Sequence, residues 1–396
     1  MQETSPSQIL GAAQRLCRQR FSRGKPHARS ARPVATVLAL LWSVSASAQI
    51  YIGQTSGFTG PAAPGVKENT EGAKLYFDHV NATGGIDGQR IELISLDDRL
   101  EPAVAAENAR RLVTERGVIA LFLNRGTPHT QAILPVLAEY RVPLVGPSTG
   151  AMILNLPVNP YVFNVRATYQ REAEKAARFL TTVSLSRIGI FQSADSFGDD
   201  AVLGALKGLN DANLKPVFAE KFDRDRPDLP KIVSTVLNMS PHAVIFIGSS
   251  GTVAEGIKAL RKAGSKAQVV TLSNNASGGF IKSLGNVGPG TVVSQVFPFE
   301  RSLGTPFVRE AIALSRKAGH PEITPAVLEG FAAAKVLVEG LRQAGHNPTR
   351  EKLLNALNGL HHLDIGGMVL GYSPTNHSGF TFSDLSIIGT DGRFVR

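Results

Sequence analysis

From residue 50 onward, the chain alternates between short apolar runs and longer amphipathic stretches. The short runs are rich in β-branched residues and end at turn-forming residues, a pattern that predicts buried strands. The longer stretches repeat apolar residues every three or four positions, which predicts helices with one buried face. The predicted strands cover 50–52, 91–96, 118–123, 144–145, 187–191, 243–247, 269–272, 291–297 and 383–388. The predicted helices cover 65–80, 102–116, 130–140, 171–183, 199–212, 228–239, 251–263, 306–318, 325–345 and 349–358.

Alternation of strand and helix at this spacing predicts βαβ units, and therefore an α/β fold with parallel sheets. A single parallel sheet rarely houses so many strands and helices around one core, so the pattern favours two α/β lobes. A Pro-rich stretch at 156–161 precedes the segment 163–169, where we place the main change of lobe. In such lobes ligands bind outside the carboxyl ends of the strands, so the loops that follow the strands form the candidate site.

These loops are rich in Gly, Ser, Thr and Asn, whose hydroxyls, amides and accessible backbone N–H groups suit a small polar ligand. Turns favour the same residue types for conformational reasons, and for any single loop that explanation is as good as the functional one. The loops are 53–62, 124–130, 146–151, 192–198, 248–252 and 273–278. Six loops of this composition at equivalent positions favour a ligand site.

The first 48 residues have a different character from the rest of the chain. Residues 1–32 carry seven basic side chains and one acidic one, and an apolar run at 34–44 ends in Ser-Ala-Ser-Ala at 45–48. This is the pattern of a secretory signal peptide cleaved near Ala48, and the apolar run is shorter than the ~20 residues that span a bilayer. The alternative is an N-terminal anchor or a buried helix. The prediction is export to a bacterial periplasm, with the mature chain starting at Gln49.

Charge and cysteine content narrow the classes of function. The formal net charge is +10, of which 1–48 carry +6, so 49–396 keep +4 without a block of five like charges. Nucleic-acid binding therefore has little electrostatic basis. The single cysteine, Cys17, lies in the predicted leader, before the apolar run, so the mature chain has no cysteine chemistry and no lipid-anchor site. His361 and His362 are adjacent and diverge, which suits a solvated loop better than a metal site.

Several short motifs follow one another in an order that resembles a known family. Residues 52–62 form a Gly- and Thr-rich loop after the first strand, and Asn81 to Gly88 read Asn-Ala-Thr-Gly-Gly-Ile-Asp-Gly. Further pieces follow at 96–98, 142–148, 163–166 and 197–200. Together they resemble the periplasmic solute-binding proteins of branched-chain amino acid ABC transporters, which have the type I periplasmic binding protein fold. The resemblance covers nearly all of 49–396.

The resemblance implies two Rossmann-like lobes with parallel-sheet cores, joined by a three-segment hinge that lets them close on a ligand. Carried over to this chain, the first lobe is 49–167 with 298–367, and the second is 168–297 with 368–396. The implied function is capture of a small solute and its delivery to an ABC transporter membrane permease, by a monomer without a cofactor, a metal or a catalytic role.

The resemblance also assigns individual residues to the ligand site. On the first lobe, hydroxyls and backbone N–H groups at corresponding positions bind a ligand carboxylate; the residues are Thr127, Thr130, Ser148, Thr149 and Gly150. Thr59, in the loop after the first strand, is a further candidate ligand-binding residue. On the second lobe, Phe197 falls where amino-acid binders often have Tyr, and Ser249 and Ser250 match the closing loop. Asn274 falls near the acidic residue that binds the ligand ammonium in amino-acid binders.

The amide at Asn274 is a departure from the family pattern that bears on the solute. A buried ammonium without a counter-charge costs several kcal/mol, so an amine-free carboxylate, an amide or a neutral solute fits better than an α-amino acid. Tyr169 and Phe197 supply an apolar wall, and Arg125 is a candidate carboxylate clamp. The alternatives are that Asp195 or another nearby acid replaces the missing charge, and that Arg125 is a solvated loop residue. Arg166 has the same chemistry but suits a structural role better.

Two other functions remain as hypotheses. Residues 146–150 fit the G-x-S-x-G pattern of serine hydrolases around Ser148, and Asp364 and His377 follow in the chain order of a triad. That motif requires a helix directly after the serine, whereas Pro157 and Pro160 leave little room for one. A ligand sensor that docks on a membrane receptor is the other hypothesis, and the sequence does not separate it from a transport protein.

Overall fold

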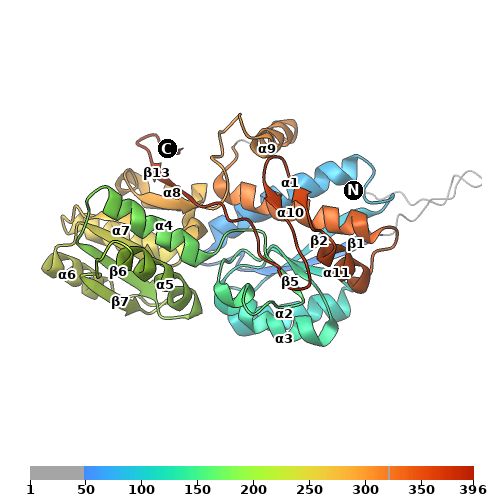
Figure 1. Cartoon of the computed structure of the whole chain (residues 1–396), viewed down its shortest axis with the longest axis horizontal. Helices are drawn as coiled ribbons and strands as arrows, with labels where there is room; N and C mark the ends of the chain where they lie inside the picture. The colour runs from blue at the N-terminus through green and yellow to red at the C-terminus, as the bar shows by residue number, and fades with distance from the viewer. Residues whose placement is uncertain (1–48, 320–321) are drawn as a thin grey trace, which may run out of the picture. The chain divides into compact units, whose positions relative to one another are not determined.

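The computed structural model describes residues 49–319 and 322–396, which belong to one compact unit; the predicted leader lies outside the described residues. The unit contains two α/β lobes, each built on its own sheet (Figure 1). This is the fold expected from the alternation of strands and helices. In both lobes, buried strands and amphipathic helices follow each other as the hydrophobic pattern predicts.

The first lobe is built on a five-stranded parallel sheet of order β2-β1-β3-β4-β5. Its strands are β1 (Gln49–Ser56), β2 (Arg90–Asp97), β3 (Ala120–Phe122), β4 (Leu144–Val145) and β5 (Val162–Phe163). One face packs against α1 (Ala63–Ala82), α9 (Pro306–Lys317), α10 (Pro325–Ala344) and α11 (Arg350–Asn358). The other face packs against α2 (Pro102–Glu115) and α3 (Thr127–Tyr140). A short hairpin of β11 (Leu363–Asp364) and β12 (Val369–Leu370) follows α11.

The second lobe is built on a seven-stranded sheet of order β14-β13-β10-β9-β8-β6-β7. The parallel strands are β6 (Ile188–Ser193), β7 (Phe218–Phe222), β8 (Ala243–Ile247), β9 (Gln268–Thr271) and β10 (Val292–Gln295). The antiparallel strands are β13 (Asp384–Ile388) and β14 (Phe394–Val395). Helices α4 (Tyr169–Thr182) and α5 (Ser196–Asn210) cover one face, and α6 (Leu229–Met239), α7 (Ser250–Lys262) and α8 (Gly278–Leu284) cover the other. Short 3₁₀ turns lie at η2 (Met152–Leu154), η3 (Ser273–Asn275) and η4 (Gly285–Val287).

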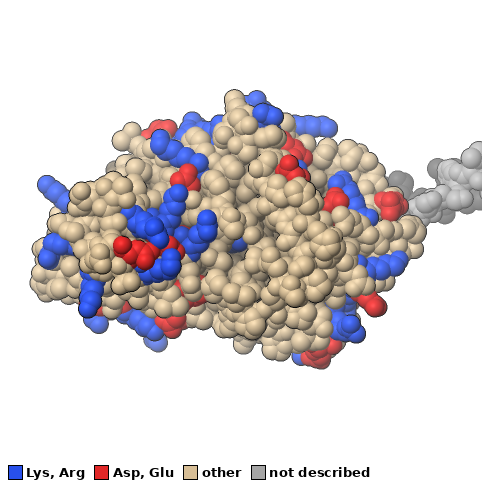
Figure 2. All heavy atoms as spheres, viewed as in Figure 1, with Lys and Arg blue, Asp and Glu red and all other residues tan. Residues whose placement is uncertain are grey.

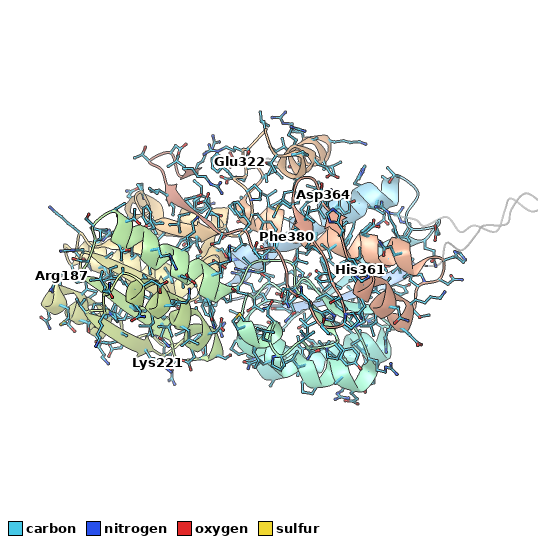
Figure 3. The ribbon with its side chains drawn as sticks, viewed as in Figure 1. Arg187, Lys221, Glu322, His361, Asp364 and Phe380 are labelled. Carbon is cyan, nitrogen blue, oxygen red and sulfur yellow. The ribbon has the colours of Figure 1, made fainter. Side chains whose placement is uncertain are left out.

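The chain passes between the lobes three times, and the crossing segments touch one another. The Phe380 backbone N–H donates to the Val165 carbonyl at 2.8 Å, and the rings of Phe297 and Phe380 lie 6.3 Å apart. Figure 3 labels Phe380 near the middle of the molecule. Met368, Tyr372 and Phe380 pack into the core of the first lobe, so a third crossing between Phe380 and β13 fits the packing better than one at residue 367.

Hydrophobic patterning missed several elements of this fold. The edge strand β7 alternates half-buried and exposed positions and contains no β-branched residue, so it lacks the signal of the buried strands. The short elements β5, α8, β11, β12 and β14 were also missed, since two to seven residues are too few to show a period.

Among the described residues, no helix is both long and apolar enough to span a bilayer. Over α4 and α5, Figure 2 shows basic side chains lying beside acidic ones. Glu174 accepts from Arg178 and Lys207 there, and Arg178 also pairs with Asp211. Exposed pairs of this kind contribute little stability, about 0–1 kcal/mol each.

Candidate functional site

A small cavity lies where the loops after the strands of the two sheets face each other. Its volume is about 30 Å³, which is room for one or two water molecules. Residues of both lobes line it: Ala62, Leu100, Arg125, Gly126, Thr127, Tyr169, Ser193, Phe197, Arg224, Ser249 and Asn274. A solute as large as an amino acid needs more space than this cavity offers.

The first lobe contributes a buried guanidinium to this cavity. Arg125 is 6% exposed and precedes Gly126, whose φ of 97° starts α3 in a conformation that favours glycine. Its Nη2 donates to the backbone carbonyl of Asn274 in the second lobe. The guanidinium lies close to Gly65 of α1, where a Cβ would be 3.1 Å from Nη1, a tight contact. Burial lowers the pKa of Arg125, yet a guanidinium stays protonated at neutral pH.

Arg125 forms no ion pair with any carboxylate of the described residues. The negative charges of Glu329 and Glu68 act on Arg125 through space and raise its pKa, but by less than burial lowers it. Glu329 lies 3.7 Å from Arg166, and Glu68 accepts from the backbone N–H groups of Gly278 and Gly279. A buried positive charge therefore faces the cavity with only a neutral carbonyl as its acceptor.

The second lobe contributes an arginine that already has a partner. Arg224 Nη1 donates to Asp195 Oδ2 at 2.8 Å. The other oxygen, Asp195 Oδ1, caps α5 by accepting from the backbone N–H groups of Phe197 and Gly198, each at 3.0 Å. Both oxygens of Asp195 are thus engaged, and Arg125, Arg224 and Asp195 together leave one net positive charge at the cavity.

Two aromatic rings form one wall of the cavity. The rings of Tyr169 and Phe197 meet edge to face with centroids 4.7 Å apart. Arg166 lies over the Tyr169 ring, 4.5 Å from its centroid, and pairs with the buried Glu172. Burial lowers the pKa of Arg166, but the neighbouring Glu172 carboxylate has the larger opposite effect together with the other nearby groups, so the pKa of Arg166 is raised overall. Arg166 therefore positions the wall from behind, in the structural role that suited it best from the sequence.

Six of the twelve residues predicted for the ligand site line the cavity: Arg125, Thr127, Tyr169, Phe197, Ser249 and Asn274. The Thr127 hydroxyl lies 2.8 Å from that of Thr149, so Thr149 stands directly behind a lining residue. Ser249 also caps α7, and the Asn274 side-chain nitrogen donates to the Gly248 carbonyl at 2.9 Å.

The other predicted residues support the loops rather than line the cavity. Thr130 Oγ1 donates to the Gly126 carbonyl at 2.9 Å, which fixes the turn that carries Arg125. Ser250 Oγ donates to Asn275 Oδ1 at 2.9 Å, and the Gly150 carbonyl accepts from Tyr169 N–H at 2.8 Å. Thr59 is exposed, and its hydroxyl donates to Asp97 Oδ2 at 2.6 Å.

The serine hydrolase hypothesis finds no assembled triad among the described residues. Ser148 Oγ donates to the side-chain oxygen of Asn69 at 2.9 Å. His377 Nε2 contacts Asn358 Oδ1 at 2.9 Å, and its Nδ1 contacts backbone carbonyls. Asp364, labelled in Figure 3, accepts from the backbone N–H groups of Gly366 and Gly367.

The described residues also contain no group of three or more His, Cys, Asp or Glu that could hold a metal ion. His361, labelled in Figure 3, uses Nδ1 to contact the Tyr372 carbonyl at 3.0 Å.

Arg224 is the charged lining residue that sequence reasoning missed. It lies in a stretch of alternating acidic and basic residues at 223–228, where a solvated loop is the ordinary explanation. Nothing local distinguishes it from Arg226, which is exposed; the pairing with Asp195 depends on β6 and β7 being neighbours in the sheet. Four other lining residues were not predicted individually: Ala62, Leu100, Gly126 and Ser193. All but Leu100 lie in loops that the sequence predicted for the site.

His129, in the first turn of α3, gives the site region a pH dependence. It is 1% exposed, and burial lowers its pKa to about 4, with Arg224, Asp195 and Asp225 acting on it through space. The unfolded chain, with a His pKa near 6.5, binds this proton more tightly than the folded chain. Stability therefore falls as the pH drops from about 6.5 to 4, by at most about 3 kcal/mol from this residue.

We expect His129→Phe to flatten that dependence, since phenylalanine fills a similar volume and cannot take up a proton. The measurement is the free energy of unfolding in urea at pH 7 and pH 4.5, for parent and variant. Burial raises the pKa of Asp98 to about 6, so protonation of Asp98 makes the folded chain more stable as the pH falls, opposite to His129. Since both proteins contain Asp98, the informative quantity is the difference between their losses of stability on acidification. Equal losses on acidification in both proteins would show that His129 does not carry this effect.

Known proteins match this chain over nearly all of its described residues. A family model described as periplasmic binding protein matches residues 49–383. The Leu/Ile/Val-binding protein of Escherichia coli (strain K12) is 22% identical over 325 residues, which are 82% of this chain and 88% of that protein.

Two solved structures share the fold. A substrate-binding periplasmic protein from Ralstonia solanacearum superposes with a TM-score of 0.81 and 30% identity, covering 88% of this chain and 99% of that one. A fatty acid ABC transporter substrate-binding protein from Thermomonospora curvata superposes with a TM-score of 0.76 and 20% identity, covering 88% of this chain and 91% of that one.

Proposed function

Because the chain belongs to the periplasmic binding protein family, among the relatives of the Leu/Ile/Val-binding proteins, we propose that it captures an amine-free carboxylate between its lobes and delivers it to an ABC transporter permease. Members of this family bind small solutes for such permeases and are not enzymes. The observation that carries the choice of solute is Arg125, a buried guanidinium at the cavity without a carboxylate partner.

A carboxylate is the anion that suits Arg125 best. Guanidinium and carboxylate match each other through two parallel hydrogen bonds, and such charge-assisted bonds are about twice as strong as neutral ones. The Asn274 carbonyl that Arg125 now contacts belongs to the opposite lobe, so parting of the lobes frees the guanidinium. An entering carboxylate then replaces a neutral acceptor by a charged one.

The same cavity is poorly suited to an ammonium group. Asn274 presents a neutral amide near the position where amino-acid binders have an acidic residue for the solute's ammonium group. The nearby Asp195 is already bound to Arg224 and to the backbone at the start of α5. A buried ammonium would add a positive charge to a cavity that already carries one in excess, and the cost of an unpaired buried charge is several kcal/mol. This favours organic acids without an amine over α-amino acids.

The fold accommodates such acids elsewhere, because the Thermomonospora curvata protein is named for fatty acids. In this chain the wall of Tyr169 and Phe197 favours an apolar or aromatic body next to the carboxylate. Closure then follows from binding: a solute that contacts both lobes shifts the population toward the closed form, which is the form a permease recognises.

The test is a thermal-shift measurement on residues 49–396 with pairs of acids that differ only in the amine. The pairs are 3-phenylpropanoate with L-phenylalanine and 4-methylpentanoate with L-leucine, and 3-phenylpropanamide serves as the uncharged control. A ligand that binds the folded state raises Tm by mass action, so the amine-free acids are expected to give the larger shifts. A larger shift with either amino acid, or an equal shift with the amide, would contradict the proposal.

A further inference from the structure

The two lobes also meet at a carboxylate that lies outside the cavity lining. Glu68 is in α1 of the first lobe, and both of its oxygens reach across to the second lobe. Oε1 accepts from the Gly279 backbone N–H at 2.8 Å, and Oε2 accepts from the Gly278 N–H at 3.0 Å. Oε2 also accepts from the Thr324 hydroxyl at 2.7 Å, within the first lobe. One side chain thus joins α1, the start of α10 and the start of α8.

These contacts supply α8 with acceptors that its own sequence lacks. The first N–H groups of a helix have no partner within the helix. Ser277 Oγ accepts from Phe280 N–H at 3.1 Å, while the N–H groups of Gly278 and Gly279 are left to Glu68. Hydrogen bonds to a carboxylate are stronger than neutral ones, so this capping is specific to a charged residue at position 68.

The shape of the contact depends on the glycine at position 279. A Cβ at Gly279 would lie 2.2 Å from the Pro64 Cβ of α1, a collision that only a glycine avoids. A second contact between the lobes lies beside this one, where the Ala326 N–H donates to the Ala276 carbonyl at 3.1 Å. The close approach of α1 to α8 therefore depends on residues of both lobes, Glu68 and Pro64 in α1 and Gly279 in α8.

We infer that Glu68, Gly278 and Gly279 form a latch that stabilises the closed form, with Glu68 as a positioning residue for solute capture. The segment 272–279 carries both Asn274, which lines the cavity, and the two glycines of the latch, so closing over a solute and closing the latch are one movement. Glu68 does not contact the solute. It sets the fraction of closed molecules, and through that fraction the apparent affinity. In its effect on affinity, the inference rests on the proposed solute capture.

The experiment measures the α1–α8 separation directly. Spin labels are attached at Lys74→Cys in α1 and Lys282→Cys in α8, both exposed, in residues 49–396, which contain no other cysteine. Double electron–electron resonance then gives the distance distribution without any solute. We expect a short-distance population in the parent and an about tenfold lower ratio of closed to open molecules in Glu68→Gln. The matched control is Glu71→Gln, which removes the same charge from an exposed position of the same helix and should leave the distribution unchanged.

A second variant separates the latch from a folding defect. Gly279→Ala keeps the Glu68 carboxylate but prevents the close approach, and it should lower the closed population as well, with an unchanged far-ultraviolet circular dichroism spectrum. The measurement is repeated with 3-phenylpropanoate, for which Glu68→Gln should need about tenfold more acid to close.

Two failures of this experiment are distinguishable. If 3-phenylpropanoate does not close the parent, this acid is not a solute of the protein, while the solute-free distributions still test the latch. If the parent shows no short-distance population without solute, or if Glu68→Gln keeps the parent's population, the latch is refuted.

Discussion

Replacing Arg125 with leucine is expected to weaken the binding of an amine-free acid by about 2–4 kcal/mol, roughly 30- to 1000-fold in Kd. The residue supplies the only charge at the cavity that has no carboxylate partner among the described residues. Its loss leaves the acid's carboxylate to the hydroxyl of Thr127 and to backbone groups. The measurement is isothermal titration calorimetry with 3-phenylpropanoate, or with whichever acid of the thermal-shift series gives the largest shift.

Two further variants make this prediction specific. Arg125→Lys keeps the charge but not the planar fork, so its affinity should lie between those of the parent and the leucine variant. Arg171→Leu removes an exposed arginine near the start of α4 and should leave binding unchanged. Because Arg125→Leu also removes a buried charge, the solute-free protein should not lose stability. Parent-like affinity in Arg125→Leu would remove the basis for assigning a carboxylate to this cavity.

Replacing Glu172 with glutamine is expected to lower the free energy of unfolding by roughly 3 kcal/mol, the largest stability effect that we predict. Glu172 is fully buried at the start of α4 and pairs with Arg166. Its Oε2 accepts from the backbone N–H of Ser273 at 2.9 Å and from the hydroxyl of Ser294. Glutamine removes the charge, and whichever way its amide turns, the NH2 group faces either Arg166 or the two donors at Oε2. Glu329, at 3.7 Å, is then the remaining carboxylate beside Arg166.

Chemical denaturation at pH 7 measures this loss. The matched control is Glu174→Gln, two residues further along the same helix, where the carboxylate pairs with Lys207 and Arg178 at the surface. Exposed pairs contribute at most about 1 kcal/mol, so the control should lose much less. Similar losses in the two variants would mean that burial does not make the Arg166–Glu172 pair important. Solute affinity in Glu172→Gln should fall as well, since Arg166 lies over the ring of Tyr169.

Much of the fold follows from local pattern. The strand β8 is buried along its whole length and its sequence is continuously apolar, as expected for the middle of a parallel sheet. The amphipathic helix α4 shows its buried face in the spacing of Ala173, Ala176, Ala177 and Leu180. The edge strand β7 is different, because only a sheet neighbour makes Phe218 to Phe222 a strand.

Some features of the candidate site could likewise be predicted from the sequence, and others could not. The loops that carry Arg125, Thr127 and Asn274 were found from the sequence, since each follows a strand and the carboxyl ends of parallel strands meet at one edge of a sheet. Within those loops, Thr127 and Asn274 were assigned by the family resemblance, and Arg125 by the match between guanidinium and carboxylate. The role of Asp195 was open at that point, because its partner Arg224 comes from another loop, 29 residues further along the chain. Glu68 gave no signal at all, being one acidic residue on an amphipathic helix.

The sequence by itself thus determined the two α/β lobes, the loops that form the site and the amide at position 274, because these depend on residue type and on short-range periodicity. Only the tertiary structure decided which charges are paired. Arg125 has no carboxylate partner, Asp195 is occupied by Arg224, and Glu68 joins the lobes through α8. The physical reason is that an ion pair depends on distances of a few ångströms between segments far apart in the chain, and those distances exist only after both sheets have formed and the lobes have met.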